Sequence, residues 1–141
     1  MIGRLNHVGV ATPSIDEALK VYRDLLGATD ITEKKPMPAF GVTVCFVGLE
    51  NSQIELLEPL GDESVVSAFL AKNPRGGQHH LCFEVPDIEA ARDEMRARGA
   101  SLVGSGEPRI GAHGLPVIFV HPKDMGGVLV ELMQTPPQAH R

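Results

Sequence analysis

Tryptophan is missing from this chain of 141 residues, and aromatic residues make up only 4% of it. The two cysteines, Cys45 and Cys82, are too few for a disulfide framework or a cysteine-rich zinc module. Both lie in apolar runs, so we expect buried thiols in a reducing compartment. Long runs of Lys and Arg are also missing and the net charge is −5, which argues against nucleic acid as a partner.

The chain also lacks an apolar run long enough to cross a membrane. No signal peptide precedes the first expected strand, so we expect a cytoplasmic protein with no membrane partner. Apolar residues make up 43% of the sequence and charged residues 22%, which is ordinary for a globular protein. The length of 141 residues suits one domain, or two small modules that share a core.

What the chain does contain is an internal repeat. Residues 5–18 reappear as residues 78–91 with a constant offset of 73, so that His7 corresponds to His80. Such self-similarity is typical of two copies of one supersecondary unit. We therefore look for chemistry-bearing residues that both copies share.

Each copy also ends in an apolar strand with a glutamate embedded in it. These residues are Glu55 and Glu131, whose offset is 76 (131 − 55) because the turn at residues 121–126 is three residues longer than its counterpart. Each half thus carries one His near its start and one Glu near its end. Four side chains able to bind a metal, related by the repeat, predict one shared metal site.

Both halves are predicted to contain a strand, a helix and three further strands. The expected strands are 4–11, 29–34, 41–48 and 53–58 in the first half and 78–85, 101–104, 115–120 and 127–133 in the second. The expected helices are 13–26, 63–70 and 87–98, with glycines that end the first and the last of them.

We expect a single domain over residues 1–136. It consists of module one (1–60), a linker helix (61–77) and module two (78–136). Residues 137–141 are expected to form a frayed tail.

Strand alternation explains why the four residues should share one surface. Successive side chains of a strand point to opposite faces, so each His or Glu lies opposite its apolar neighbours. The neighbours expected to face helices are Val8, Val10, Ile54, Leu56, Leu81, Phe83, Val130 and Leu132. A carboxylate in such a strand is costly to bury unless it is paired or coordinated. Two imidazoles and two carboxylates form a neutral site with a divalent cation.

Each of these residues also has an ordinary explanation. A lone His in a strand is more often a hydrogen-bonded structural residue, and a lone Glu more often lies on a solvated face. The recurrence of both types in both halves favours the metal site. Among the other histidines, we expect a supporting or structural role for His79, a loop position or pocket role for His113, a turn role for His121 and a tail position for His140.

The doubled module with its His, Glu, His, Glu pattern resembles the vicinal oxygen chelate superfamily, which has the glyoxalase fold. Within it, the chain resembles the methylmalonyl-CoA epimerase family. The segments that carry this resemblance are 5–11, 54–61, 76–82, 110–124 and 126–132. The stretch from Gly-Ala-His-Gly to Pro-Lys-Asp within 110–124 is the most specific of them.

The resemblance implies an α+β fold in which two βαβββ modules form an open, curved sheet or barrel around a metal site. It implies a homodimeric enzyme that acts on a small acyl-CoA substrate. One divalent metal ion would be held by His7, Glu55, His80 and Glu131. Cobalt is expected first, with manganese, nickel and zinc as alternatives.

The resemblance also implies proton transfer at C2, next to the thioester carbonyl. Glu131 is the expected catalytic base. Some family members carry a second Glu where this chain has Val44, so the second proton-transfer group is open. A metal-held water, Glu55 and a residue of the loop containing His113 are the candidates.

Three other functions compete with this one. A lactoylglutathione lyase (glyoxalase I) uses the same ligand types, and only the segment from residue 110 to 132 favours the epimerase over it. A metal-free binding module of the same fold tends to lack the full ligand set. A ring-cleaving dioxygenase uses two His and one Glu with iron, which leaves Glu55 unexplained. Lys123 and Arg75 are candidates for contacts with the coenzyme A phosphates, and solvated surface charges are the alternative.

Overall fold

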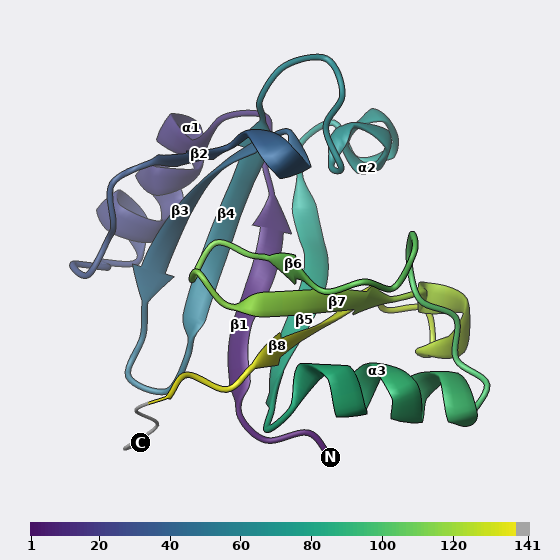
Figure 1. Cartoon of the computed structure of the whole chain (residues 1–141). Helices are drawn as coiled ribbons and strands as arrows, with labels where there is room; N and C mark the ends of the chain where they lie inside the picture. The colour runs from purple at the N-terminus through teal and green to yellow at the C-terminus, as the bar shows by residue number, and fades with distance from the viewer. Residues whose placement is uncertain (138–141) are drawn as a thin grey trace. The chain divides into compact units, whose positions relative to one another are not determined.

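The computed structural model describes residues 1–137 and divides into two compact units (Figure 1). We call His7–His79 the first unit, and Met1–Asn6 together with the residues from His80 onward the second unit. The expected tail 137–141 lies outside the described residues except for residue 137.

The first unit contains a mixed sheet with strand order β2-β3-β4-β1, in which β1 and β4 are parallel and the other neighbours antiparallel. Its strands are β1 (Leu5–Ala11, whose first two residues belong to the second unit), β2 (Lys35–Met37), β3 (Val42–Gly48) and β4 (Gln53–Pro59). Its helical segments are α1 (Ile15–Leu19), η1 (Lys20–Leu25), η2 (Pro38–Phe40) and α2 (Ser67–Lys72).

Hydrogen bonds to side chains mark the start of the helix formed by α1 and η1, and a glycine marks its end. The Ser14 hydroxyl accepts a hydrogen bond from the Glu17 amide at 3.2 Å, which satisfies one of the free N–H groups of the first turn. The Glu58 carboxylate accepts another from the Ile15 amide at 2.6 Å. The chain leaves the helix at Gly27, whose φ of 74° suits a residue without a side chain.

The second unit repeats this arrangement with strand order β5-β8-β7-β6, where β5 and β8 are parallel. Its strands are β5 (Gly77–Val85, whose first three residues belong to the first unit), β6 (Arg109–Ile110), β7 (Pro116–Val120) and β8 (Val130–Gln134). Its helical segments are α3 (Ile88–Ala97) and η3 (Pro122–Asp124). Each unit therefore follows the predicted order of strand, helix and three strands, which confirms the α+β class and the two βαβββ modules.

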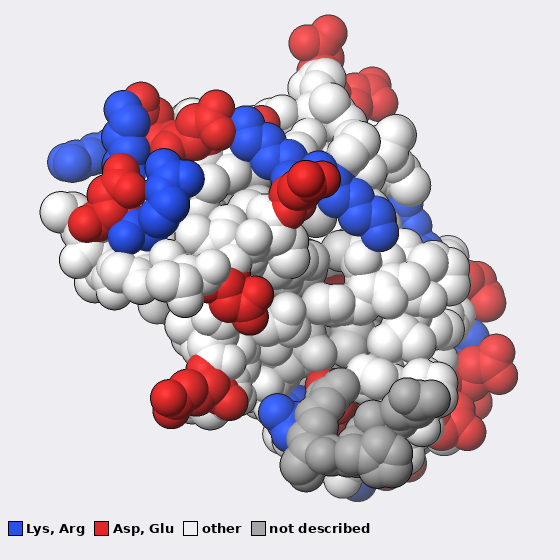
Figure 2. All heavy atoms as spheres, turned by 90° about the vertical axis from the view of Figure 1, so that its left-hand side faces the viewer, with Lys and Arg blue, Asp and Glu red and all other residues white. Residues whose placement is uncertain are grey.

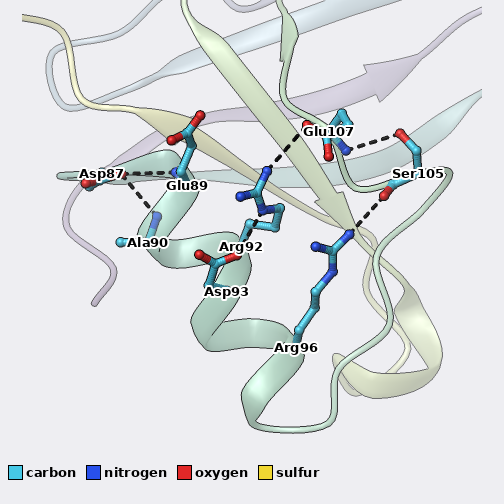
Figure 3. Close-up of polar contacts among 8 residues, drawn as sticks. All are labelled: Asp87, Glu89, Ala90, Arg92, Asp93, Arg96, Ser105 and Glu107. Carbon is cyan, nitrogen blue, oxygen red and sulfur yellow. Dashed lines mark hydrogen bonds and ion pairs between the residues drawn. The ribbon is translucent and has the colours of Figure 1, made fainter.

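Polar contacts fix both the start of α3 and the segment that follows this helix. Asp87 caps the helix by accepting hydrogen bonds from the amides of the second and third residues after it, both at 3.1 Å (Figure 3). Arg92 lies 3.5 Å from the Glu107 carboxylate, and the Arg96 guanidinium donates to the Ser105 carbonyl at 2.9 Å. The loop between α3 and β6 is thus tied to the helix.

The apolar cores confirm most of the predicted strand faces. In the first unit, Val10, Ile54 and Leu56 belong to the cluster built around Ile15 and Leu19 of the helix. In the second, a cluster of α3 and the strands includes three more of the predicted residues, Phe83, Val130 and Leu132. The two remaining ones, Val8 and Leu81, are half-buried and lie outside both clusters.

The second strand of the first unit differs from the prediction. Residues 29–34 form only a bridge between Ile31 and Val47, and the strand is β2 instead. The Thr32 hydroxyl accepts the hydrogen bond of the Phe46 amide at 2.9 Å, so a side chain takes the place of a backbone carbonyl and the ladder stops. Pro36 is tolerated in β2 because this strand is at the edge of the sheet.

The second strand of the other unit and the linker helix also lie elsewhere than predicted. Residues 101–104 contribute only a bridge between Leu102 and Val120, because the Asp124 side chain accepts the Ser101 amide hydrogen bond at 2.8 Å. The paired strand is β6, further along the chain. The linker helix begins at Ser67, after a turn in which its amide bonds to the Ser64 carbonyl at 3.2 Å.

No helix among residues 1–137 combines the length and the apolar character that a membrane span requires. Cys45 and Cys82 are buried free thiols, as predicted. Burial raises the pKa of the Cys45 thiol, as is typical of a structural cysteine.

Candidate functional site

In the first unit, His7 and Glu55 form a buried pair on the sheet face opposite the helix. His7 is 2% exposed and Glu55 is 5% exposed. The His7 Nε2 atom lies 3.5 Å from a Glu55 carboxylate oxygen. Gly9, the register partner of Glu55 on β1, has no side chain and leaves room beside the carboxylate.

In the second unit, His80 and Glu131 form the corresponding pair. Their exposed fractions are 4% and 7%, and His80 Nε2 lies 3.2 Å from a Glu131 carboxylate oxygen. Cys82, another small residue, is the register partner of Glu131. The structure therefore brings each predicted His together with the Glu of its own unit, in two nearly equal copies.

A phenylalanine completes each pair, and the sequence analysis missed both. The ring of Phe46 lies edge to face with that of His7, with centroids 5.9 Å apart. The rings of Phe119 and His80 also have centroids 5.9 Å apart. The signal was present in the sequence, because Phe46 and Phe119 are separated by the same offset of 73 (119 − 46) as the histidines.

A third buried carboxylate was missed as well. Glu84 is 1% exposed and lies on the same face of β5 as His80 and Cys82. The Asn6 side-chain amide donates a hydrogen bond to it at 2.9 Å. The repeat places Ala11 at the corresponding position of the first unit, so this departure from the repeat was the available signal.

The donor sets of the two pairs fit a divalent metal ion. Two ligand atoms bound to one ion at about 2.1 Å lie roughly 3.0–3.4 Å apart in octahedral or tetrahedral geometry. The two His–Glu separations are 3.5 and 3.2 Å, close to that range and longer than a charge-assisted hydrogen bond. Imidazole and carboxylate together suit borderline metals such as cobalt and zinc. A cation would also compensate carboxylates that are buried among apolar residues.

Three other predicted positions, Val44, His113 and His79, do not belong to the two His–Glu pairs. Val44 is buried in β3 opposite Leu57, so this position carries no proton-transfer group. His113 is exposed in the turn between β6 and β7. His79 lies edge to face with Phe69 of α2, with centroids 5.4 Å apart, which indicates a packing role.

The other predicted residues lie in turns, at the surface or in the tail. The ring nitrogen Nδ1 of His121 accepts a hydrogen bond from the Lys123 amide at 3.1 Å, which confirms its turn role. His140 lies outside the described residues. Lys123 and Arg75 are exposed.

Charges of both signs are interleaved on the face seen in Figure 2. In the first unit, Lys34 lies 2.7 Å from Asp16, and Lys20 lies 3.0 Å from Glu17. Contact with Asp16 raises the pKa of the Lys34 ammonium group. Each of these two basic side chains therefore has an acidic partner.

Known proteins match the chain over most of its length. The sequence model of the glyoxalase/bleomycin resistance protein/dioxygenase superfamily matches residues 6–119. The ethylmalonyl-CoA/methylmalonyl-CoA epimerase of Cereibacter sphaeroides is 56% identical over 95% of this chain and 99% of its own length. The mitochondrial methylmalonyl-CoA epimerase of Mus musculus is 53% identical over 94% of this chain and 74% of its own.

Solved structures agree in fold. A methylmalonyl-CoA epimerase in complex with methylmalonyl-CoA and ammonium superposes with a TM-score of 0.88 at 31% identity, and the match covers 97% of each chain.

Proposed function

Because this chain belongs to the glyoxalase/bleomycin resistance protein/dioxygenase superfamily, we propose that it interconverts the two configurations of methylmalonyl-CoA at C2. The observation that carries the proposal is the 56% identity to an epimerase along 99% of that relative's length. The two buried His–Glu pairs support it, because imidazoles and carboxylates are the residue types that metal binding and proton transfer at C2 need.

We propose that His7, Glu55, His80 and Glu131 hold one divalent metal ion, as is typical of this family. The proposal rests on the repeat and on the donor chemistry of each pair. Cobalt is the first candidate, with manganese, nickel and zinc as alternatives. When bound, the ion supplies stabilisation of the negative charge that develops on the thioester oxygen.

Glu131 is proposed as the base that removes the C2 proton. Its carboxylate is buried and held next to the His80 ring at 3.2 Å, which restricts its orientation. A carboxylate shielded from water can accept the proton on one face and return it. Inversion also needs a group on the other face. A metal-held water, Glu55 and a residue of the loop containing His113 are the candidates, since Val44 cannot transfer a proton.

A substrate assay distinguishes this function from glyoxalase I. One C2 epimer of methylmalonyl-CoA is incubated in D₂O with metal-loaded enzyme, and deuterium at C2 and formation of the other epimer are followed. The hemithioacetal of methylglyoxal and glutathione is tested in parallel. Inversion with deuterium uptake supports the epimerase. Turnover of the hemithioacetal alone, or exchange without inversion, contradicts it.

Ethylmalonyl-CoA is a second substrate to test, because the Cereibacter sphaeroides relative is named for both acyl-CoA esters. We further propose a cytoplasmic homodimer, which light scattering on the purified chain and cell fractionation would check.

A further inference from the structure

The same aromatic contact occurs once in each unit. The planes of the Phe46 and His7 rings meet at 78°, and those of Phe119 and His80 at 83°, with equal centroid separations of 5.9 Å. Edge-to-face contacts of this kind are attractive and directional. Their recurrence in both copies of the repeat, with the same geometry, indicates a requirement that the two His–Glu pairs share.

We propose that Phe46 and Phe119 are positioning residues of the two His–Glu pairs: each ring sets the orientation of an imidazole and shields the adjacent carboxylate from water. This inference rests on the proposed function, because it assigns the phenylalanines a role at the metal ligands.

The strand register supports the shielding role. Phe46 is the register partner of Glu55, and Phe119 is the register partner of Glu131. In each unit the Glu strand lies between the His strand and the Phe strand, in the orders β1-β4-β3 and β5-β8-β7. Because each Phe ring reaches the His ring from the far side of the Glu strand, it must extend along the Glu side chain. This explains how both glutamate residues remain at 7% exposure or less.

The ring contact also limits how each imidazole can rotate. The terminal torsion of a histidine side chain is soft, so its ring turns unless neighbours hold it. A phenylalanine edge or face against the ring removes part of this freedom before any metal binds. Groups that orient metal ligands typically contribute about 10- to 100-fold to metal affinity. An apolar contact is weaker than a hydrogen bond, so we expect a loss of about 10-fold when the ring is removed.

The test compares Phe46→Leu and Phe119→Leu with a matched control, Phe83→Leu. Phe83 lies on β5, as His80 does, but on the opposite face, where it packs against the core cluster of α3. All three variants lose the same atoms. Binding of Co²⁺ is measured by competition with a chelator, and the visible absorption of the bound cobalt is recorded. Melting temperatures are measured in the metal-free state.

We expect both site variants to bind Co²⁺ about 10-fold more weakly and to show a changed cobalt spectrum. Phe83→Leu should lower the melting temperature but leave affinity and spectrum at the wild-type values. Phe46→Tyr, which keeps the ring, should restore most of the affinity that the leucine variant loses. For epimerisation, the site variants should lower kcat while KM stays within about twofold, since the proposed role of each ring is to hold a metal ligand.

Two results would overturn the inference. If wild-type protein binds Co²⁺ and both leucine variants bind it equally well with the same spectrum, the phenylalanines are ordinary packing residues and the metal site stands. If the wild-type chain binds no Co²⁺, Mn²⁺, Ni²⁺ or Zn²⁺, the proposed metal site falls and this inference falls with it.

Discussion

The internal repeat permits an unusually well-controlled test of the catalytic base. Glu55 and Glu131 occupy equivalent positions, with similar burial and similar distances to their histidines. Glu131→Gln and Glu55→Gln therefore remove the same negative charge from equivalent surroundings. If Glu131 takes the C2 proton of one epimer, its variant loses exchange from that epimer, whereas Glu55→Gln loses exchange from the other epimer only if Glu55 is the second proton-transfer group.

The expected magnitudes follow from these roles. A carboxamide oxygen can still coordinate a metal, so both variants should keep part of the metal affinity. Loss of a general base typically costs about 10²–10⁴-fold in rate, which corresponds to roughly 2.7–5.5 kcal/mol in activation free energy. Any loss from weakened metal binding is common to both variants and is removed by saturating them with metal.

The assay follows deuterium uptake at C2 from each C2 epimer separately, at saturating metal and substrate. Glu131→Gln should slow exchange from one epimer by about 10²–10⁴-fold, with the melting temperature of the metal-free protein little changed. Equal losses from the same epimer in the two variants would show that the effect comes from the shared ligand role. Wild-type exchange in Glu131→Gln would refute the assignment of the base without affecting family membership.

Three further perturbations test the site and the fold. His7→Ala should remove stoichiometric metal, measured by elemental analysis, while the far-UV circular dichroism spectrum stays close to wild type; full metal content would place the site elsewhere. Gly41→Ala should destabilise the chain in urea unfolding by about 1–3 kcal/mol more than Gly61→Ala does. Both glycines have positive φ (64° and 80°), but of the two only Gly41 lies where an added Cβ would overlap backbone atoms of the linker. Hydrogen bonds from Ser101 lower the pKa of the Asp124 carboxyl, so its contribution to stability is present above the ordinary aspartate range and is lost as the pH falls through the lowered pKa. Asp124→Asn should therefore lower the melting temperature relative to wild type at about pH 7 and lose this difference near about pH 2; a difference independent of pH would contradict the assignment.

Much of this protein is determined locally. The period of two in a strand places His7 and Glu55 opposite their apolar neighbours whatever the strands pair with. Ser14 and Asp87 cap helices through bonds to amides two or three residues away, so these starts are readable from short segments. For the same reason the repeat alone predicts two copies of one unit with one His and one Glu in each.

The tertiary structure decided which side chains meet across strands. The pairing of each His with the Glu of its own unit and the reach of Phe46 to His7 depend on sheet order and register, which are long-range. The sequence pattern predicts the edge strands at the wrong residues, because side chains such as Thr32 accept hydrogen bonds from the backbone of a distant strand. The burial of Glu84 also depends on tertiary structure. Its carboxylate accepts a hydrogen bond from the Asn6 side-chain amide, 78 positions away in the sequence. Whether a charge can be buried depends on such spatial partners and not on its neighbours in the chain.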